Sequence, residues 1–538
     1  MSGNSAVRDA LFALRVTERK DGRAAIIYRR RADAQGRDRL QRVAALGPLA
    51  YQAGLPLLRD AVRAERRNGT ASAHRGANGA ANGAANGAAS LLRPGPFLPL
   101  GAAWGALLLV RIAWAGSFTA IGLQEVNAHG HAQIFGWVGL FVMGFAYYGL
   151  PRLKQVELAH PSLARLSLWL MGGGLVVRSV CQAAVVAWAG FGLPAVLASV
   201  AEIAAIGILV WVVLATLRNA EAGLEFLDYY VLAALGWFLV QAIYGTVYFT
   251  ATLLAPGRDE LLGLVATWQG PLREIQIHGF AMLMILGVSQ RVLPPLYGLR
   301  RPSAARSLSA LVGINGALVG VVTGLLLMRL AGHAWAGLWY LSVLAMAAAT
   351  VALVRRWGLF GPVERSNRSL KYVRAAYAWL FISLAMLVAL PLYQFGLLPW
   401  LAPESEAASI GFSHAYYGAI RHTVTVGYVS LMIMGVAARM VPEFQDIRQE
   451  SLGRLWTPFL LVNTGCAIRV VSQTWTDFAA PAFAVTGVSG LLELTGLAVW
   501  GVHLWRLMSR PKAAISPSID ERDAARHCEA SRCSVLSV

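Results

Sequence analysis

Three stretches of the chain carry histidine, glycine and proline at related spacings, and their histidines offer the clearest chemistry in the sequence. His131–Pro151 and His422–Pro442 share the pattern H-x4-G-x7-G-x6-P at every marked position. A third stretch, His278–Pro294, keeps the last glycine and the proline, and its histidine lies four residues closer to the proline. All three lie in apolar surroundings, where a histidine needs partners for its ring nitrogens.

The matching register of His131 and His422 predicts a pair of axial haem ligands. Two neutral imidazoles at one depth on facing helices supply what a six-coordinate haem iron needs. The glycines would admit either a flat macrocycle or a closely packed helix. The alternative is that each histidine only hydrogen-bonds a neighbouring helix. His278, one helical turn deeper, is predicted to bind a second metal or a second haem.

Three further polar residues lie near the predicted ligand pair. His129 precedes His131 by two residues, so on a helix its side chain points about 200° away. His414 lies about 12 Å further out than His422 along the same helix. We expect His129 and His414 near the outer surface, where they either bind copper, which imidazole suits, or contact water. Arg421 is a candidate partner for a haem propionate.

Two pairs of opposite charges fall inside apolar runs. Arg178 and Glu202 lie at similar depth in neighbouring predicted helices, and Arg469 and Glu493 do the same further along the chain. An isolated charge in hydrocarbon is costly, so we predict that each pair is an ion pair. The functional alternative is a path for protons.

The composition explains which elements must position these residues. The chain has 538 residues, 57% of them hydrophobic and only 14% charged, against roughly 25% charged in a soluble domain. The apolar residues form runs of about 20, which cross a bilayer as helices. We predict an all-α polytopic fold with about twelve transmembrane helices in three quasi-repeated four-helix units, because the histidine stretches fall four helices apart. The predicted spans are 97–118, 129–150, 162–189, 193–217, 226–254, 276–297, 306–330, 334–354, 373–398, 413–441, 455–476 and 480–507.

The distribution of basic residues predicts the topology. The links after the second, sixth and eighth predicted helices are basic, which places both termini on the cytoplasmic side of a bacterial inner membrane. Residues 1–93 hold 17 Arg and Lys against 7 Asp and Glu, as expected of a cytoplasmic extension and with no recognised nucleic-acid-binding motif. Residues 24–28 are a candidate strand in this extension. The four cysteines form no close pair, so no disulfide framework is predicted.

The predicted domains follow from these features. Residues 76–95 include a low-complexity Gly, Ala and Asn stretch typical of a flexible linker. The linker separates a basic extension, 1–75, from a twelve-helix body, 96–508, and a cytoplasmic tail, 509–538, ends the chain.

Three segments of the body resemble the NnrS family, haem- and copper-containing membrane proteins linked to nitric-oxide metabolism. Asn127–Val138 is similar to the His-Ala-His stretch of an early helix of that family. Gly287–Leu299 resembles its Gly-Arg-x-x-Pro segment, and Arg421–Val441 its late His-x-x-x-x-Gly helix. The resemblance covers roughly residues 93–507. It implies a membrane-embedded protein with haem, and with copper as a further expected cofactor.

The arrangement is also similar to the catalytic subunits of haem-copper oxidases and nitric-oxide reductases, whose low-spin haem is held from helices 2 and 10. His131 and His422 fall on those helices. The copper site of that superfamily uses histidines from helices 6 and 7, whereas this chain has only His278 on helix 6 and no histidine on helix 7. Met282 also stands four residues after His278, where many oxidases have tyrosine. A dioxygen-reducing centre of that kind is therefore not expected.

We expect an NnrS-like protein that takes part in nitric-oxide metabolism or in resistance to nitrosative stress. Its expected partners are membrane lipid, nitric oxide or a related small molecule, and an electron donor, while catalytic turnover stays open. The alternatives are a divergent oxidase or reductase subunit and a polytopic transporter without haem.

Overall fold

The computed structural model describes residues 14–18, 24–29, 40–46, 99–221, 223–364, 366–444, 447 and 452–509. The chain divides into two compact units, Met1–Asn82 and Gly83–Val538. The predicted linker and the tail beyond Ser509 lie outside the described residues.

The first unit contains a three-stranded antiparallel sheet of β1 (Leu14–Glu18), β2 (Ala24–Arg29) and β3 (Leu40–Leu46). β2 is the central strand, and a bulge interrupts its pairing with β3 between Ala25 and Ile27. The strand predicted for residues 24–28 is thereby confirmed. The prediction of an all-α chain holds for the described part of the second unit only.

The described part of the second unit is all-helical, and ten of its helices are long and apolar enough to cross a membrane. The prediction of a multi-pass membrane protein is confirmed to that extent. Helix α3 (Trp104–Ala115) is shorter, and α19 (Trp456–Trp475) is a further long helix, so the count of twelve stays a prediction. The ten spans are Leu123–Lys154, Pro161–Ala184, Ala189–Arg218, Phe226–Leu254, Arg258–Tyr297, Ala304–Leu330, His333–Arg355, Leu370–Leu401, His414–Glu443 and Ala482–Met508.

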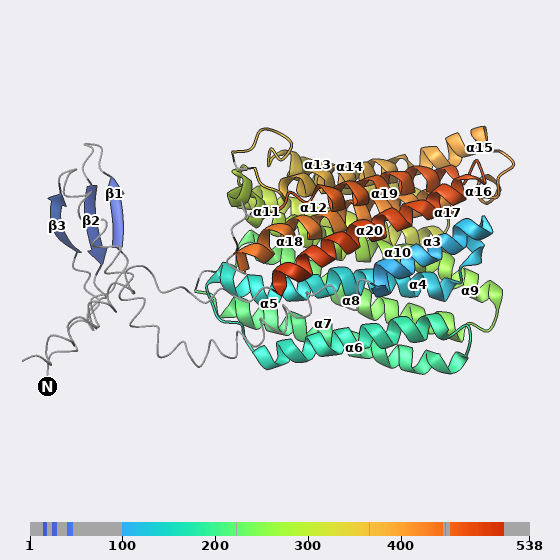
Figure 1. Ribbon diagram of the computed structural model, residues 1–538, viewed down its shortest axis with the longest axis horizontal. Coiled ribbons are helices and arrows are strands. Elements are labelled where there is room, and N and C mark those ends of the chain that lie inside the picture. The colour runs from blue at the N-terminus through green and yellow to red at the C-terminus, as the bar shows by residue number, and fades with distance from the viewer. Residues whose placement is uncertain are drawn as a thin grey trace, which may run out of the picture. The chain divides into compact units, whose positions relative to one another are not determined.

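Neighbouring helices pack as antiparallel pairs, and they run side by side along the unit in Figure 1. The pairs are α6 with α7, α12 with α13 and α19 with α20, and α20 also packs against α3. Besides α3 and α19, the long helices outside the histidine stretches are α6 (Pro161–Ala184), α7 (Gly192–Arg218), α8 (Phe226–Leu254), α12 (Ala304–Leu330), α13 (Ala336–Arg355), α14 (Leu370–Leu392) and α20 (Ala482–Met508). The short elements are η1 (Pro99–Ala103), η2 (Phe118–Ala120), η4 (Ala189–Phe191), η7 (His333–Trp335), η8 (Tyr393–Leu397), α15 (Leu398–Leu401) and α16 (Glu406–Ile410).

Two of the spans begin earlier than hydropathy predicts. The helix predicted to start at residue 129 starts at Leu123, and the one predicted at 276 belongs to Arg258–Tyr297. Polar residues lower the hydropathy of these early turns, but they find partners inside the protein. Gln124, for example, donates to Thr252 Oγ1 at 3.1 Å, which removes the cost of burying its amide.

Each of the three histidine stretches forms a helix interrupted by eight residues of π-helix. The π-helical segments are η3 (Ala132–Gly139), η6 (Ile275–Met282) and η9 (Thr423–Ser430). Each lies at the same distance before the final proline of its stretch, Pro151, Pro294 or Pro442. Such segments within α-helices are frequently found at functional sites. The repeat seen in the sequence is therefore also a repeat of backbone conformation. The flanking helices are α4 (Leu123–His131), α5 (Leu140–Lys154), α9 (Arg258–Leu264), η5 (Val265–Gln269), α10 (Gly270–Glu274), α11 (Leu283–Tyr297), α17 (His414–His422) and α18 (Leu431–Phe444).

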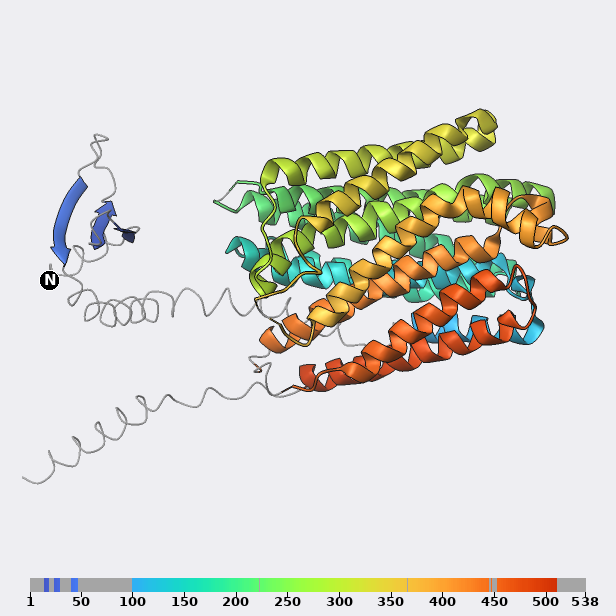
Figure 2. The same ribbon diagram turned by 90° about the horizontal axis from the view of Figure 1, so that it is seen from above.

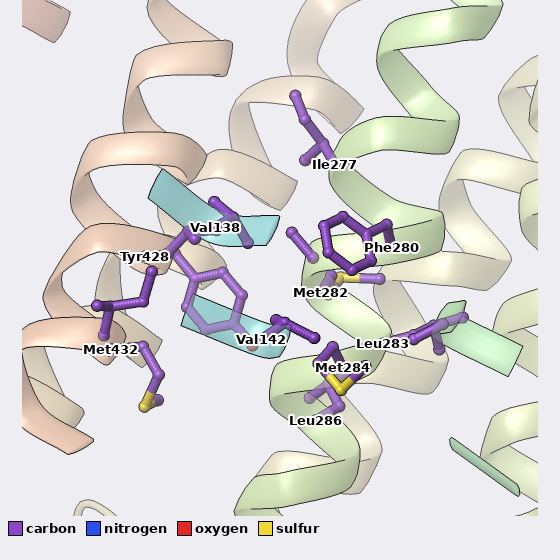
Figure 3. Close-up of a cluster of buried hydrophobic side chains, with 14 of the residues drawn as sticks. Val138, Val142, Ile277, Phe280, Met282, Leu283, Met284, Leu286, Tyr428 and Met432 are labelled. Atoms are coloured by element: carbon purple, nitrogen blue, oxygen red, sulfur yellow. The ribbon is translucent and has the colours of Figure 1, made fainter. Parts of the chain in front are cut away.

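These three interrupted helices meet in the centre of the main hydrophobic core. Figure 3 shows Val138 and Val142 from one of them, Phe280 from the second and Tyr428 and Met432 from the third. Phe280 and Tyr428 have no exposed surface. The core thus fixes the three histidine-bearing helices against one another.

The repeated glycines serve helix packing. A Cβ placed on Gly287 would lie 2.4 Å from Cβ of Tyr230 on α8, and one on the equivalent Gly435 would lie 2.9 Å from Cβ of Tyr372 on α14. Since neither tyrosine can move its Cβ without moving its helix, only glycine fits at these positions.

We expect Gly287→Ala to destabilise the protein by about 1–3 kcal/mol, the usual cost of overpacking a core. Thermal unfolding in detergent measures the change. Gly316→Ala is the matched control, because a Cβ there meets no atom within 4 Å. Equal melting temperatures for the two variants would contradict the packing role of Gly287.

Candidate functional site

One interior cavity brings together His129 from α4 and His422 from the end of α17. Its volume is about 170 Å³, and η1, α3, η3, η6, η9, α19 and α20 also contribute to its walls. Arg469 of α19 and Glu493 of α20 also line it. We call this space the histidine cavity. These four residues come from α4, early in the unit, and from α17, α19 and α20, late in the chain, so the packing of the bundle creates the cavity.

Both imidazole rings of the histidine cavity are anchored through Nδ1. His129 Nδ1 lies 3.1 Å from the carbonyl oxygen of Gly101, and His422 Nδ1 lies 3.0 Å from that of Gly418. Because a carbonyl oxygen only accepts, each Nδ1 carries the proton and each Nε2 carries a lone pair. Within the described residues, no hydrogen bond engages either Nε2. This is the tautomer that metal-ligating histidines adopt, with the other nitrogen donating to a backbone carbonyl.

The backbone of α3 forms a cradle for one of these rings. A Cβ on Gly105 would lie 2.5 Å from Cε1 of His129. A larger residue at position 105 would therefore displace the His129 ring. Together with the Gly101 carbonyl, this close contact fixes where the ring lies.

The charged wall of the histidine cavity is unsatisfied. Arg469 Nε and Nη1 and Glu493 Oε1 are buried and have no hydrogen-bond partner among the described residues. Arg469 and Glu493, which the sequence predicts to form an ion pair, line the same cavity, but these three atoms do not hydrogen-bond one another. Buried polar atoms without partners cost free energy, so they indicate a missing ligand or ordered water. An arginine with two free donors suits a carboxylate.

His131 lies in a different environment from His422. Its Nε2 donates to both carboxylate oxygens of Glu202, at 3.0 and 2.9 Å, and its ring stacks on Phe135 with 4.0 Å between centroids. It lines a separate cavity of about 30 Å³ with Arg178 and Arg273. The structure therefore does not bring His131 and His422 to one cavity, and Glu202 already occupies the His131 nitrogen that would bind iron.

The expected Arg178–Glu202 pair takes another form. Arg178 donates through Nε to Gln182 at 3.2 Å and through Nη1 to Ser199, and its guanidinium lies 4.3 Å from the centroid of the Phe249 ring. The carboxylate of Glu202 accepts from His131 instead. The two residues still lie on the packed helices α6 and α7, but the carboxylate of Glu202 is hydrogen-bonded to His131 and not to Arg178.

His278 belongs to a third polar group. Its Nδ1 donates to Glu274 Oε2 at 2.7 Å, and the other oxygen of Glu274 accepts from Tyr417 at 3.1 Å. Arg421 lies over the Tyr417 ring, 4.3 Å from its centroid. A histidine that donates to a carboxylate through one nitrogen is oriented for a ligand at the other. Arg421 does not line the histidine cavity, so a contact between it and a group bound there stays a prediction.

The remaining candidate, His414, lies apart from these groups. His414 is exposed at the start of α17, 4.8 Å from the Phe412 ring. The described residues contain no group of three or more His, Cys, Asp or Glu side chains that could hold a metal ion. The sequence does not predict that His129 and His422 line one cavity. It also does not single out Glu274 as the hydrogen-bond partner of His278, although a spacing of four residues places the two on one face of a helix.

The long apolar helices and their buried histidines define a multi-pass membrane protein with a polar site inside the bundle. The chain belongs to the NnrS protein family, whose model matches residues 95–512. The match includes all three histidine stretches and leaves the first unit outside. A comparison with curated proteins found no match.

Proposed function

We propose that the chain is a haem-binding inner-membrane protein that handles nitric oxide or helps the cell resist nitrosative stress. The observation that carries the proposal is the histidine cavity, where two imidazoles present free Nε2 atoms from different helices. Membership of the NnrS family supports the same function. Bound haem would supply an iron centre for ligand binding or electron transfer.

His129 and His422 are the residues that would hold the haem iron in this proposal. Their Nδ1 protons are held by backbone carbonyls, which leaves each ring oriented and ready to coordinate. Arg469 would hold a haem propionate through its free Nε and Nη1 donors. The pairing of His131 with His422 is the competing ligand set, and it requires Glu202 to release the His131 ring.

An apolar cavity beside the histidine cavity supports nitric oxide as the small molecule. It has a volume of about 70 Å³ and is lined by side chains such as Phe141 and Met432. It shares Val138, Ala281 and Val429 with the histidine cavity. A small uncharged molecule that dissolves in lipid would reach the site this way, whereas ions would not.

We propose twelve transmembrane helices in three four-helix units, with both termini in the cytoplasm, since the basic links lie at one end of the bundle. His278, oriented by Glu274, is the proposed ligand of a second metal, for which copper is the candidate. His414 is exposed and would be an outer ligand only with donors from elsewhere.

The absorption spectrum of the purified protein tests the proposal. We expect a Soret band that shifts on reduction and again when nitric oxide is added. Consumption of nitric oxide with a reduced donor would identify a reductase, and binding without turnover would identify a tolerance protein. A metal-free protein with no Soret band, even after haem is supplied, would contradict the proposal and favour a transporter.

A further inference from the structure

A basic cavity of about 630 Å³ lies where α12 begins and α13 ends, and it shares no lining residue with the histidine cavity. Four arginines line it. Arg300 and Arg301 come from the link after α11, Arg306 from the first turn of α12 and Arg356 from the end of α13. A backbone hydrogen bond of 3.3 Å from Arg300 to Trp357 ties the two segments together.

The charge of this basic cavity has no counterpart in the described part of the chain. All four arginines are exposed, and among the described residues their guanidinium groups form no ion pair and no side-chain hydrogen bond. Four like charges around one space repel each other unless an anion lies among them. Ser303, which precedes α12, also keeps its hydroxyl free of a capping bond. The cavity is therefore built to attract an anion.

The other wall of the basic cavity is apolar. It consists of Ala310 on α12 and Ala349, Ala352 and Leu353 on α13. The spans that contain α12 and α13 are the least buried of the ten, with 33% and 28% of their apolar windows buried against 78% for Leu123–Lys154. Figure 2 shows α12, in yellow-green, along one edge of the helical bundle. A ligand with an anionic head and an apolar body fits both walls.

We propose that the basic cavity binds the phosphate group of an anionic phospholipid, with the acyl chains lying against the apolar wall of α12 and α13. Arginine forks bind phosphate oxygens in pairs, and basic pockets between helices at the cytoplasmic face bind lipid headgroups in this way. The lipid would clamp the α11–α12 link to the end of α13. This inference does not depend on haem.

The test uses the delipidated full-length protein in a neutral detergent, with its melting temperature followed during titration. The ligands are phosphatidylglycerol, zwitterionic phosphatidylcholine and soluble glycerol 3-phosphate. We expect stabilisation by phosphatidylglycerol alone. Arg300→Gln with Arg306→Gln should weaken this apparent affinity roughly thirtyfold, because each arginine near an anionic headgroup contributes about 1 kcal/mol of attraction. Native mass spectrometry of the wild-type protein should show a retained anionic lipid.

Arg258→Gln with Arg329→Gln is the matched control, since it removes two exposed arginines that do not line the basic cavity. It should titrate like the wild type. Equal stabilisation by glycerol 3-phosphate would identify a soluble phosphate compound as the ligand and overturn the lipid proposal. Equal effects of the two lipids, or unchanged titration of the Arg300 and Arg306 variant, would also overturn it.

Discussion

We expect His422→Ala to abolish most haem binding and His129→Ala to do the same, whereas His131→Gln should retain haem. The first two changes each remove an Nε2 that faces the histidine cavity. Loss of a residue that merely orients a ligand already costs 10–100-fold in metal affinity, so loss of a ligand itself should cost more than about tenfold. His131→Gln keeps an amide donor for Glu202 and touches neither proposed ligand.

The ratio of Soret absorbance to protein absorbance measures this result, after growth with excess haem precursor. Circular dichroism and thermal unfolding show whether each variant is folded. The three variants distinguish the pairing of His129 with His422 from that of His131 with His422. His422 belongs to both pairs, whereas His129 and His131 each belong to only one. Haem loss in His131→Gln with full retention in His129→Ala would establish the pairing of His131 with His422 and exclude His129. Full retention in His422→Ala would exclude both.

We expect Lys154→Met to destabilise the protein by about 3–5 kcal/mol, the usual cost of removing one partner of a buried ion pair. Lys154 Nζ lies 2.6 Å from Asp228 Oδ2, and the two side chains are 5% and 0% exposed. The backbone N–H of Glu225 also donates to Asp228 Oδ2, at 2.7 Å. Removal of the lysine leaves a carboxylate in the interior with only this neutral donor.

Two further variants define what the lysine does. Lys154→Met with Asp228→Leu removes both charges and should recover much of the lost stability, since apolar residues often replace a buried pair without cost. Arg152→Met, two residues away, removes an exposed cation and should change the melting temperature little. An equally large loss in the Arg152 variant would show that the general positive charge of this helix end matters, and not the pair with Asp228.

The π-helical segments explain why the sequence does not predict which histidines line the histidine cavity. A π-helical turn holds more residues than an α-helical turn, so it rotates the residues before it relative to those after it. The histidines at 129, 131 and 422 all lie just before such a segment. Their facing therefore depends on backbone geometry that the regular period of 3.6 residues does not describe.

The sequence by itself determined the class of protein and the repeat. Long apolar runs specify membrane-spanning helices because every backbone polar group must be satisfied within its own segment in lipid. Hydropathy is a local property, so most spans were predicted within a few residues of their bounds. The shared spacing of histidine, glycine and proline marked the three helices that the structure also interrupts with π-helix.

Only the tertiary structure decided which side chains meet. Register placed His131 level with His422, but depth along a helix does not tell which neighbouring helix a side chain faces. Residues two apart point in nearly opposite directions, so His129 and His131 line different cavities. The partners of buried charges were decided in the same way, since Glu202 accepts from His131 while Arg178 binds neutral groups. Such pairings depend on the packing of helices distant in sequence, and that packing leaves no pattern within any one of them.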